Sequence, residues 1–394
     1  MKLKIFSCLF LCVWSIQVNA QFNELTLQQA IQKATLGNPN VKLSDLKITR
    51  EESFKLASMN ISSPEILFEA PTGDELRPGV LQTFDFPIQY VRRFQAQGKL
   101  AELSEAEKLQ VLNELRYQVR LAYNELQYLK EVEVAYIQQD SLLSDFLKVT
   151  EVRLSVGQIS PIERMNALSQ SKEIEYQLNQ IRSKERRALL DLSLLLGTPG
   201  DTTWLVSDAF KALQVPEIIN LNMMNNPQVL IGKKNLELSE ARWKAERSGW
   251  MPGLVIGYLN QSDAETEARY RMRYGFSVPL WFFSQNSRVK TAKTEIQIAQ
   301  QQQVTTDFTL NGRMNDAISS LKQYSEALNY YQNTGLGMAA DITTMAKEAY
   351  RIGSIGYYNY LLNLQQVEKI RLGYLEALRN FNQSIFTIQL LKAE

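Results

Sequence analysis

The sequence predicts a mainly α-helical protein with a small β part, built from two tandem repeats of helix, β-hairpin, long helix and returning helix. Three pairs of short segments indicate the duplication: "GNPNV" and "NNPQV", "FDFPI" and "FSVPL", and "SVGQIS" and "RIGSIG". Their anchor residues are Pro39 and Pro227, Pro87 and Pro279, and Gly157 and Gly353. The pairs occur in one order, and their separation grows from 188 to 192 to 196 residues. Each step of four residues is about one helical turn, so an apolar stripe keeps its phase.

Residues 1–20 predict export from the cytoplasm. Two lysines, Lys2 and Lys4, precede an apolar run from Ile5 to Trp14, and a small-residue cleavage site ends at Ala20. This order is typical of a secretory signal peptide. The apolar run is too short for a membrane-spanning helix, which needs about 20 residues.

Cysteine and histidine are absent from the expected mature chain. Cys8 and Cys12 lie in the signal peptide, without the small-residue context of a lipid-attachment site, and the sequence has no histidine. Disulfides, Cys/His metal sites and His-dependent catalytic pairs are therefore excluded. Without the two signal-peptide lysines, 41 basic residues face 42 acidic ones, so the net charge is close to zero and nothing attracts nucleic acid. We therefore expect that the protein is not an enzyme and that it has no cofactor and no metal site.

The first repeat is predicted to occupy residues 21–200. A helix follows Pro39 to about residue 60, and alternating apolar residues predict a β-hairpin at about 65–88. A helical hairpin at about 95–197 follows, whose proline-free first helix, at about 95–154, has a length of roughly 90 Å. Its returning helix begins at "SPIE", where Ser160 is the expected N-cap and Glu163 closes a capping box.

The second repeat is predicted to occupy residues 201–394, with a helix at 227–248, a β-hairpin at about 253–280 and a helical hairpin at about 287–391. In "RMRYGFSV", apolar Met272, Tyr274 and Phe276 alternate with Arg271 and Arg273. Period two with an aromatic-rich face indicates a strand. The two shorter helices of each repeat together nearly equal one long helix, so we expect them to stack end to end beside it.

The strand pattern favours an outer-membrane barrel. Strands of about ten residues with an apolar outer face suit such a barrel, which needs at least about eight strands. Four strands cannot close, and an open edge cannot lie in lipid because its backbone groups would lack hydrogen bonds. The chain would then supply part of a shared barrel. The alternative is a soluble coiled-coil protein whose hairpins pack on themselves.

Together, the "NP" helix starts, the "FDFPI" and "FSVPL" exits and the "SVGQIS" and "RIGSIG" turns resemble the TolC family of outer-membrane efflux proteins over nearly all of the mature chain. The resemblance implies a homotrimer with a shared 12-stranded transmembrane β-barrel and a trimeric α-helical barrel extending into the periplasm of a Gram-negative bacterium. It implies a passive duct for small toxic solutes, drugs or metal ions, opened by a periplasmic adaptor protein and an inner-membrane pump of the resistance-nodulation-division type. "GYLNQS" and "VPLWF" further resemble the branch that serves heavy-metal pumps.

The resemblance also implies site residues. Adaptor-docking tips correspond to Ser155, Val156, Gly157, Ile352, Gly353 and Ser354. Residues of the periplasmic mouth correspond to Glu163, Tyr350, Asn359 and Leu362. Leu362 stands at an acidic position of the family and Ile355 at a basic one, so the carboxylate ring is weakened and the latch is expected to be apolar or to use a Glu163–Tyr350 hydrogen bond. Arg271 and Arg273 would line the barrel lumen.

Several alternatives stay open at this stage. The tip glycines also serve simple helix reversal, and Glu163 also serves as an ordinary cap. The arginines of the strand could pair with Asp263, Glu265 or Glu267 instead of facing a lumen. A duct for type I protein secretion shares the architecture, and a non-pore periplasmic adaptor or scaffold is a further possibility. An outer-membrane hydrolase would need a catalytic constellation that the sequence lacks.

Overall fold

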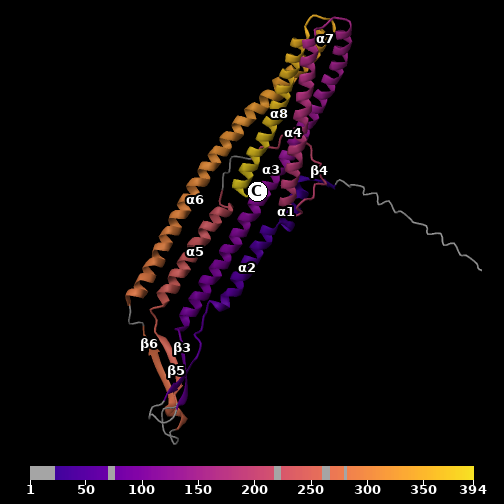
Figure 1. Cartoon of the computed structure of the whole chain (residues 1–394). Coiled ribbons are helices and arrows are strands. Elements are labelled where there is room, and N and C mark those ends of the chain that lie inside the picture. Colours follow the sequence, from indigo (N-terminus) through magenta and orange to yellow (C-terminus); the bar gives the residue numbers. More distant parts are fainter. Residues whose placement is uncertain (1–22, 70–75, 217–222, 260–266, 279–281) are drawn as a thin grey trace, which may run out of the picture.

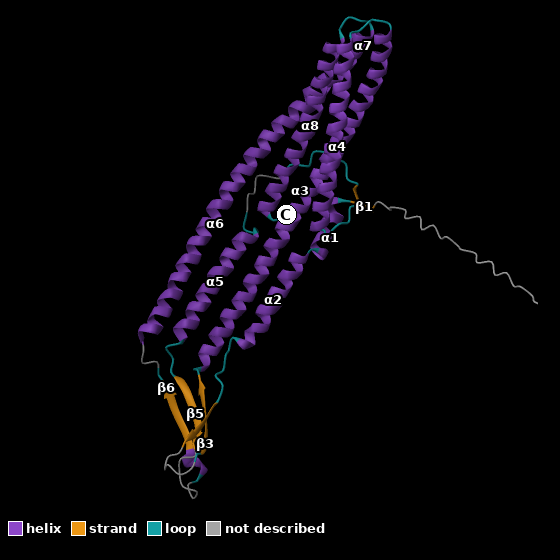
Figure 2. Cartoon of the chain, in the orientation of Figure 1, coloured by secondary structure: helices purple, strands orange, loops and turns teal. Residues whose placement is uncertain are grey.

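The chain folds into a long helical rod with a β-sheet at one end and two helix reversals at the other (Figures 1 and 2). The computed structural model describes residues 23–69, 76–216, 223–259, 267–278 and 282–394. The expected signal peptide, Pro279, Asp263 and Glu265 lie outside the described residues. Mainly helical structure with few strands confirms the predicted fold class.

The helices and strands follow the repeated order. The helices are α1 (Leu27–Gly37), α2 (Pro39–Ala57), α3 (Pro87–Ser155), α4 (Pro161–Leu195), α5 (Pro227–Ser248), α6 (Phe282–Tyr330), α7 (Leu336–Arg351) and α8 (Tyr357–Lys392). A 3₁₀ turn, η1 (Ala268–Arg271), and a π-helix, η2 (Tyr331–Gly335), complete them. The strands are β1 (Asn23–Leu25), β2 (Glu65–Glu69), β3 (Arg77–Phe84), β4 (Trp204–Val206), β5 (Gly253–Leu259) and β6 (Met272–Ser277). No described helix is both long enough and apolar enough to cross a membrane.

Two asparagines join helices end to end at equivalent places in the two repeats. The side-chain oxygen of Asn38 accepts from the backbone N–H of Asn40, and its amide donates to the Leu195 carbonyl at 3.0 Å. Asn226 likewise caps α5, and its amide donates to the Leu391 carbonyl at 2.9 Å. Each asparagine therefore starts one helix while satisfying the last turn of another, which would otherwise have orphan carbonyls. As the length arithmetic predicts, α4 and α2 stack beside α3, and α8 and α5 stack beside α6.

The four longer strands form one antiparallel sheet in the order β2-β3-β5-β6. The hairpins of the two repeats are therefore joined through β3 and β5, where Phe84 pairs with Leu254. Across β5 and β6, Leu254 lies opposite Phe276 and Ile256 opposite Tyr274, which places the predicted aromatic residues on one face. This face is exposed: Tyr274 retains 76% and Phe276 73% of its accessible surface. Within the described residues, β2 and β6 have no further strand partner.

A short parallel pair, β1 with β4, fastens the start of the first repeat to the linker between the repeats. The buried Tyr123 hydroxyl lies 2.8 Å from the Leu25 carbonyl and 3.0 Å from Oδ2 of Asp208. Asp208 also accepts from the backbone N–H of Leu27 at 2.8 Å. Burial raises the pKa of Tyr123 to about 12, so the hydroxyl remains a proton donor at physiological pH.

The two long helices differ in regularity. The sequence predicts a start at about residue 95, but the first long helix, α3, begins at Pro87. Proline is tolerated at the first position of a helix because the backbone N–H that it lacks would have no partner there. The second is interrupted by η2 between α6 and α7. At this interruption Tyr331 and Gly335 pack against α8 near Gly373 and Ile370. Figure 1 shows that α6 bends toward α8 as it approaches the end that carries the reversals.

Candidate functional site

The predicted docking residues lie at the end of the rod farthest from the sheet (Figure 1). Each hairpin reverses at a glycine with positive φ, 72° at Gly157 and 78° at Gly353. A Cβ atom at either glycine would meet nothing within 4 Å, so backbone conformation, rather than space, requires glycine there. The six residues of the two tips are all exposed. Helix reversal accounts for the glycines, and adaptor docking stays a prediction.

Just below the tips, an aromatic cluster joins the two helical hairpins. Its four members are Phe146 of α3, Tyr350 of α7, and Tyr357 and Tyr360 of α8. Phe146 stacks on Tyr357 with ring centroids 4.9 Å apart, and Tyr350 stacks on Tyr360 at 4.9 Å. Such ring pairs contribute about 0.5–1.5 kcal/mol each beyond their buried area. The cluster therefore holds the second hairpin against the first.

Arg153, in the last turn of α3, contacts this cluster at Tyr350. Its guanidinium lies 4.8 Å from the centroid of the Tyr350 ring, and Nη1 donates to the Tyr350 hydroxyl at 3.2 Å. Burial raises the pKa of Tyr350, and the nearby guanidinium opposes that rise. Burial also raises the pKa of Tyr357 to about 12, and its hydroxyl finds no hydrogen-bond partner among the described residues. Sequence reasoning missed Arg153, although its place in the last turn beside a tip glycine was a usable signal.

The other predicted mouth residues do not join the cluster. Oε2 of Glu163 accepts from the backbone N–H of Ser160 at 2.9 Å, which confirms the predicted capping box. Within the chain Glu163 is therefore a helix cap. The Tyr350 hydroxyl accepts a hydrogen bond from Arg153 and makes none with Glu163. Asn359 and Leu362 are exposed on α8, and Leu362 retains 44% of its accessible surface.

The two predicted lumen arginines occupy different positions. Arg273 lies in β6 opposite Gly257, on the face away from Tyr274. Arg271 ends η1 just before the strand, and its Nη1 lies 3.4 Å from the Tyr258 hydroxyl. Tyr258 belongs to the apolar face, because it pairs with Met272. The two arginines thus do not continue one alternating strand face, since the 3₁₀ turn breaks the period before Met272. Of the predicted acidic partners, Glu267 pairs with Arg269.

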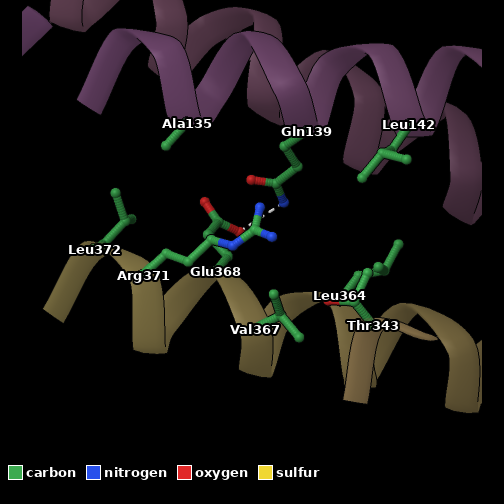
Figure 3. A pocket seen from close by; sticks show the side chains of 9 residues that line it. All are labelled: Ala135, Gln139, Leu142, Thr343, Leu364, Val367, Glu368, Arg371 and Leu372. Atoms are coloured by element: carbon green, nitrogen blue, oxygen red, sulfur yellow. Dashed lines mark hydrogen bonds between the residues drawn. The ribbon is translucent and has the colours of Figure 1, made fainter. Parts of the chain in front are cut away.

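A small cleft with a mostly aliphatic lining lies between α3, α7 and α8 (Figure 3). Its cavity volume is about 30 Å³, which admits a water molecule but no larger ligand. Gln139 of α3 donates to Oε2 of Glu368 at 2.6 Å, and burial raises the pKa of Glu368. The described residues contain no cluster of three or more acidic side chains that could hold a metal ion.

Comparisons with known proteins agree with this geometry. Residues 218–391 match the family described as outer membrane efflux proteins. The cobalt-zinc-cadmium resistance protein CzcC of Cupriavidus metallidurans is 23% identical over 375 residues, covering 92% of this chain and 89% of that protein.

Two solved structures share the fold along nearly the whole chain. The CmeC outer membrane channel of Campylobacter jejuni has a TM-score of 0.77 at 16% identity, covering 100% of this chain and 94% of that one. The outer membrane protein VceC of Vibrio cholerae has a TM-score of 0.76 at 14% identity, covering 93% and 96%. The fold is also shared with the outer-membrane channel OprN and with CusC, which forms a transmembrane channel.

Proposed function

We propose that the chain is one subunit of an outer-membrane channel that exports small toxic solutes from the periplasm, because residues 218–391 match the outer membrane efflux protein family and the fold follows that of outer-membrane channels over nearly the whole chain. The observation that carries this proposal is the sheet at one end of the rod. Its exposed face bears large apolar side chains, including Phe68, Tyr274 and Phe276, and its outer strands β2 and β6 lack partners among the described residues. A sheet with an apolar outer face and two open edges is suited to lipid only when copies close it.

Three copies would satisfy these edges. Four strands from each copy make twelve, which exceeds the roughly eight that a transmembrane barrel needs. The rods would then form a tunnel across the periplasm. In outer-membrane efflux systems of this kind the channel works with an adaptor and a pump, and the exposed tips at Gly157 and Gly353 are where we place the adaptor.

Heavy-metal cargo is supported by the likeness to the cobalt-zinc-cadmium resistance protein. The chain itself offers no soft ligands for such ions, since the expected mature sequence has no cysteine and no histidine. Selection of the cargo would therefore lie with the pump. The match to channel structures over nearly the whole chain disfavours a non-pore scaffold, and nothing in the fold favours protein secretion over solute export.

The experiment is to extract the protein from the outer-membrane fraction in detergent and measure its mass, then its conductance in planar bilayers. We expect a mass of three chains plus detergent and stepwise ion conductance. A monomer recovered from the soluble periplasmic fraction would overturn the proposal.

A further inference from the structure

Six basic residues gather where α5 and α6 approach the sheet (Figure 1). We call them the basic collar: Arg242, Lys244 and Arg247 in the last two turns of α5, and Arg288, Lys290 and Lys293 near the start of α6. The two helix ends lie side by side, because the Gln285 side chain donates to the Glu246 carbonyl. All six residues are exposed, and among the described residues none of them is in an ion pair. The same two segments hold three acidic residues, Glu240, Glu246 and Glu295, so positive charge is in excess.

The first repeat shows that the helices do not require these charges. At separations of 188 residues for α2 and α5 and 192 residues for α3 and α6, the equivalent residues are Phe54, Leu56, Met59, Ala96, Gly98 and Ala101. None of them is charged. The first repeat has other cations nearby, of which Arg93 and Lys99 are in ion pairs and Lys55 and Arg92 are not. The excess of cations outside ion pairs is therefore concentrated in the second repeat.

Large apolar side chains separate the basic collar from the sheet. Trp250 and Met251 follow α5, and Phe282 and Phe283 begin α6; their exposed fractions lie between 41% and 66%. Aromatic side chains of this kind are typical of the boundary between lipid and water. The long stems of lysine and arginine carry their charges from such a boundary into the headgroup layer.

We propose that the basic collar binds anionic headgroups of the membrane leaflet that faces the rod, so that the protein prefers an anionic phospholipid to a zwitterionic one; this rests on the proposed outer-membrane location. At 1.5 Å per residue, Arg247 is about 5 Å from Trp250, and Arg288 is about 8 Å beyond Phe283. The headgroup layer on each side of a bilayer is roughly 5–8 Å thick. The other four cations follow within about 15 Å, which is about one Debye length beyond the headgroups.

The competing explanation is that the basic collar lines the lumen of the tunnel and attracts anionic solutes. The apolar side chains beside the collar favour lipid, because a water-filled lumen does not stabilise exposed Phe282 and Phe283. The two explanations differ in what neutralising the charges should change: lipid binding in the first, and the ion selectivity of the channel in the second.

The test measures lipid binding to the detergent-solubilised assembly by native mass spectrometry. The probes are phosphatidylglycerol, which is anionic, and phosphatidylethanolamine, which is zwitterionic, with identical acyl chains. We expect phosphatidylglycerol to bind about tenfold more tightly at low salt, since each cation near the surface adds to the attraction. The preference should fall in high salt, because the exposed charges are then screened.

A triple variant locates the preference. Arg247→Gln with Arg288→Gln and Lys290→Gln should remove it and leave the binding of phosphatidylethanolamine unchanged. The matched control neutralises three exposed cations of α4, with Lys184→Gln, Arg186→Gln and Arg187→Gln, and should keep the preference. These lie far from the sheet: their neighbour Arg182 binds Glu133 at 2.8 Å, roughly 70 Å along α3 from Pro87.

The outcomes separate this proposal from the proposed function. If the protein forms a conducting channel but shows no lipid preference, or if the collar variant keeps it, the basic collar does not bind lipid and the channel stands. A changed ion selectivity with unchanged lipid binding places the collar in the lumen and also overturns the proposal, and a soluble monomer overturns both. Should the collar variant fail to assemble, hydrogen exchange of the wild type decides: phosphatidylglycerol must protect residues 242–250 and 282–290 more than phosphatidylethanolamine does, and equal protection overturns the proposal.

Discussion

The first and second repeats have the same order of elements, but they differ in the regularity of the long helix and in the hydrophobic core beside it. The long helix of the first repeat is unbroken from Pro87 to Ser155, whereas that of the second contains a π-helix at Tyr331–Gly335. Around the unbroken helix lies a large core that includes Val119, Tyr123 and Leu126. Among the described residues, the hydrophobic cluster beside the π-helix is small and consists of Ala339, Val367 and Ile370. The helical irregularity thus lies beside the smaller of these two hydrophobic clusters.

The junctions between stacked helices differ in a similar way. In the first repeat Gly197 has φ 76°, and a Cβ there would lie 2.2 Å from the Gly37 carbonyl oxygen. The residue 196 positions later is Ala393, which adopts φ 61° despite its side chain. The first junction is therefore closed so tightly that only glycine fits, while the second leaves room for a methyl group.

The largest expected effect is at this junction. Gly197→Ala should lower the free energy of unfolding by about 3 kcal/mol, because left-handed strain and a backbone overlap add together. The converse change, Ala393→Gly, relieves strain and should alter it by at most about 1 kcal/mol. Denaturant unfolding of the purified protein compares the two, and equal effects would contradict the difference between the junctions.

The π-helix offers the next test. A Cβ at Gly373 would lie 2.4 Å from the Tyr331 hydroxyl oxygen, at the far end of a flexible side chain that can move aside. Gly373→Ala should therefore cost about 1–2 kcal/mol and accelerate hydrogen exchange at Tyr331–Gly335.

Gly337→Ala is the matched control, since a Cβ there meets nothing within 4 Å in a helix. It should stabilise α7 by about 0.5–1 kcal/mol. Unchanged exchange in Gly373→Ala would show that Tyr331 does not hold the π-helix.

At the tip, Tyr350→Phe removes the hydroxyl that Arg153 binds but keeps the ring. The loss of one hydrogen bond to a charged group is worth about 1.5–3 kcal/mol, so the channel should open at least about ten times more often if this contact is made only in the closed state. Single-channel recording measures this, with Tyr358→Phe, an exposed tyrosine of α8, as the control. If both variants gate like the wild type, the contact between Arg153 and Tyr350 does not restrain the mouth.

The smallest effect concerns the ion pairs between α3 and α5. Lys99 binds Glu102 and Glu237, at 2.9 and 3.0 Å, and Lys234 binds Glu102 at 2.7 Å and Glu237 at 3.2 Å. Hydrogen bonds from Lys234 and Lys99 lower the pKa of Glu102, and those from Lys99 and Lys234 lower that of Glu237. The stabilisation is therefore present above the ordinary glutamate pKa and is lost as pH falls through the lowered values.

Because these groups are about one third exposed, Glu237→Gln should cost less than about 1 kcal/mol at pH 7. The difference between variant and wild type should vanish in acid and shrink in high salt. Unfolding measured at pH 7 and pH 3 checks the sign, and a difference that grows in acid would contradict it.

The sequence was most informative where local chemistry decides structure. The proline after Asn38, the Ser160 capping box and the alternation around Tyr274 each predicted an element within a few residues. The pairing of β3 with β5 could not be predicted, because it joins residues far apart in the chain. The three-residue strands β1 and β4 are too short to show a period. Arg271 was placed in a strand because alternation alone does not reveal the 3₁₀ turn before Met272.

The central claim, that the sheet is completed by neighbouring copies, is tested most directly by disulfide cross-linking across its two edges. The expected mature chain has no cysteine, so any disulfide must form between introduced cysteines. A suitable pair is Ile66→Cys on β2 and Tyr274→Cys on β6. A scan of such pairs in intact outer membranes should yield covalent dimers and trimers on oxidation, while Ile66→Cys with Leu254→Cys on the inner strand β5 should not. If every variant with an edge pair remains monomeric after oxidation, the strands are not shared between copies, and the shared barrel is contradicted.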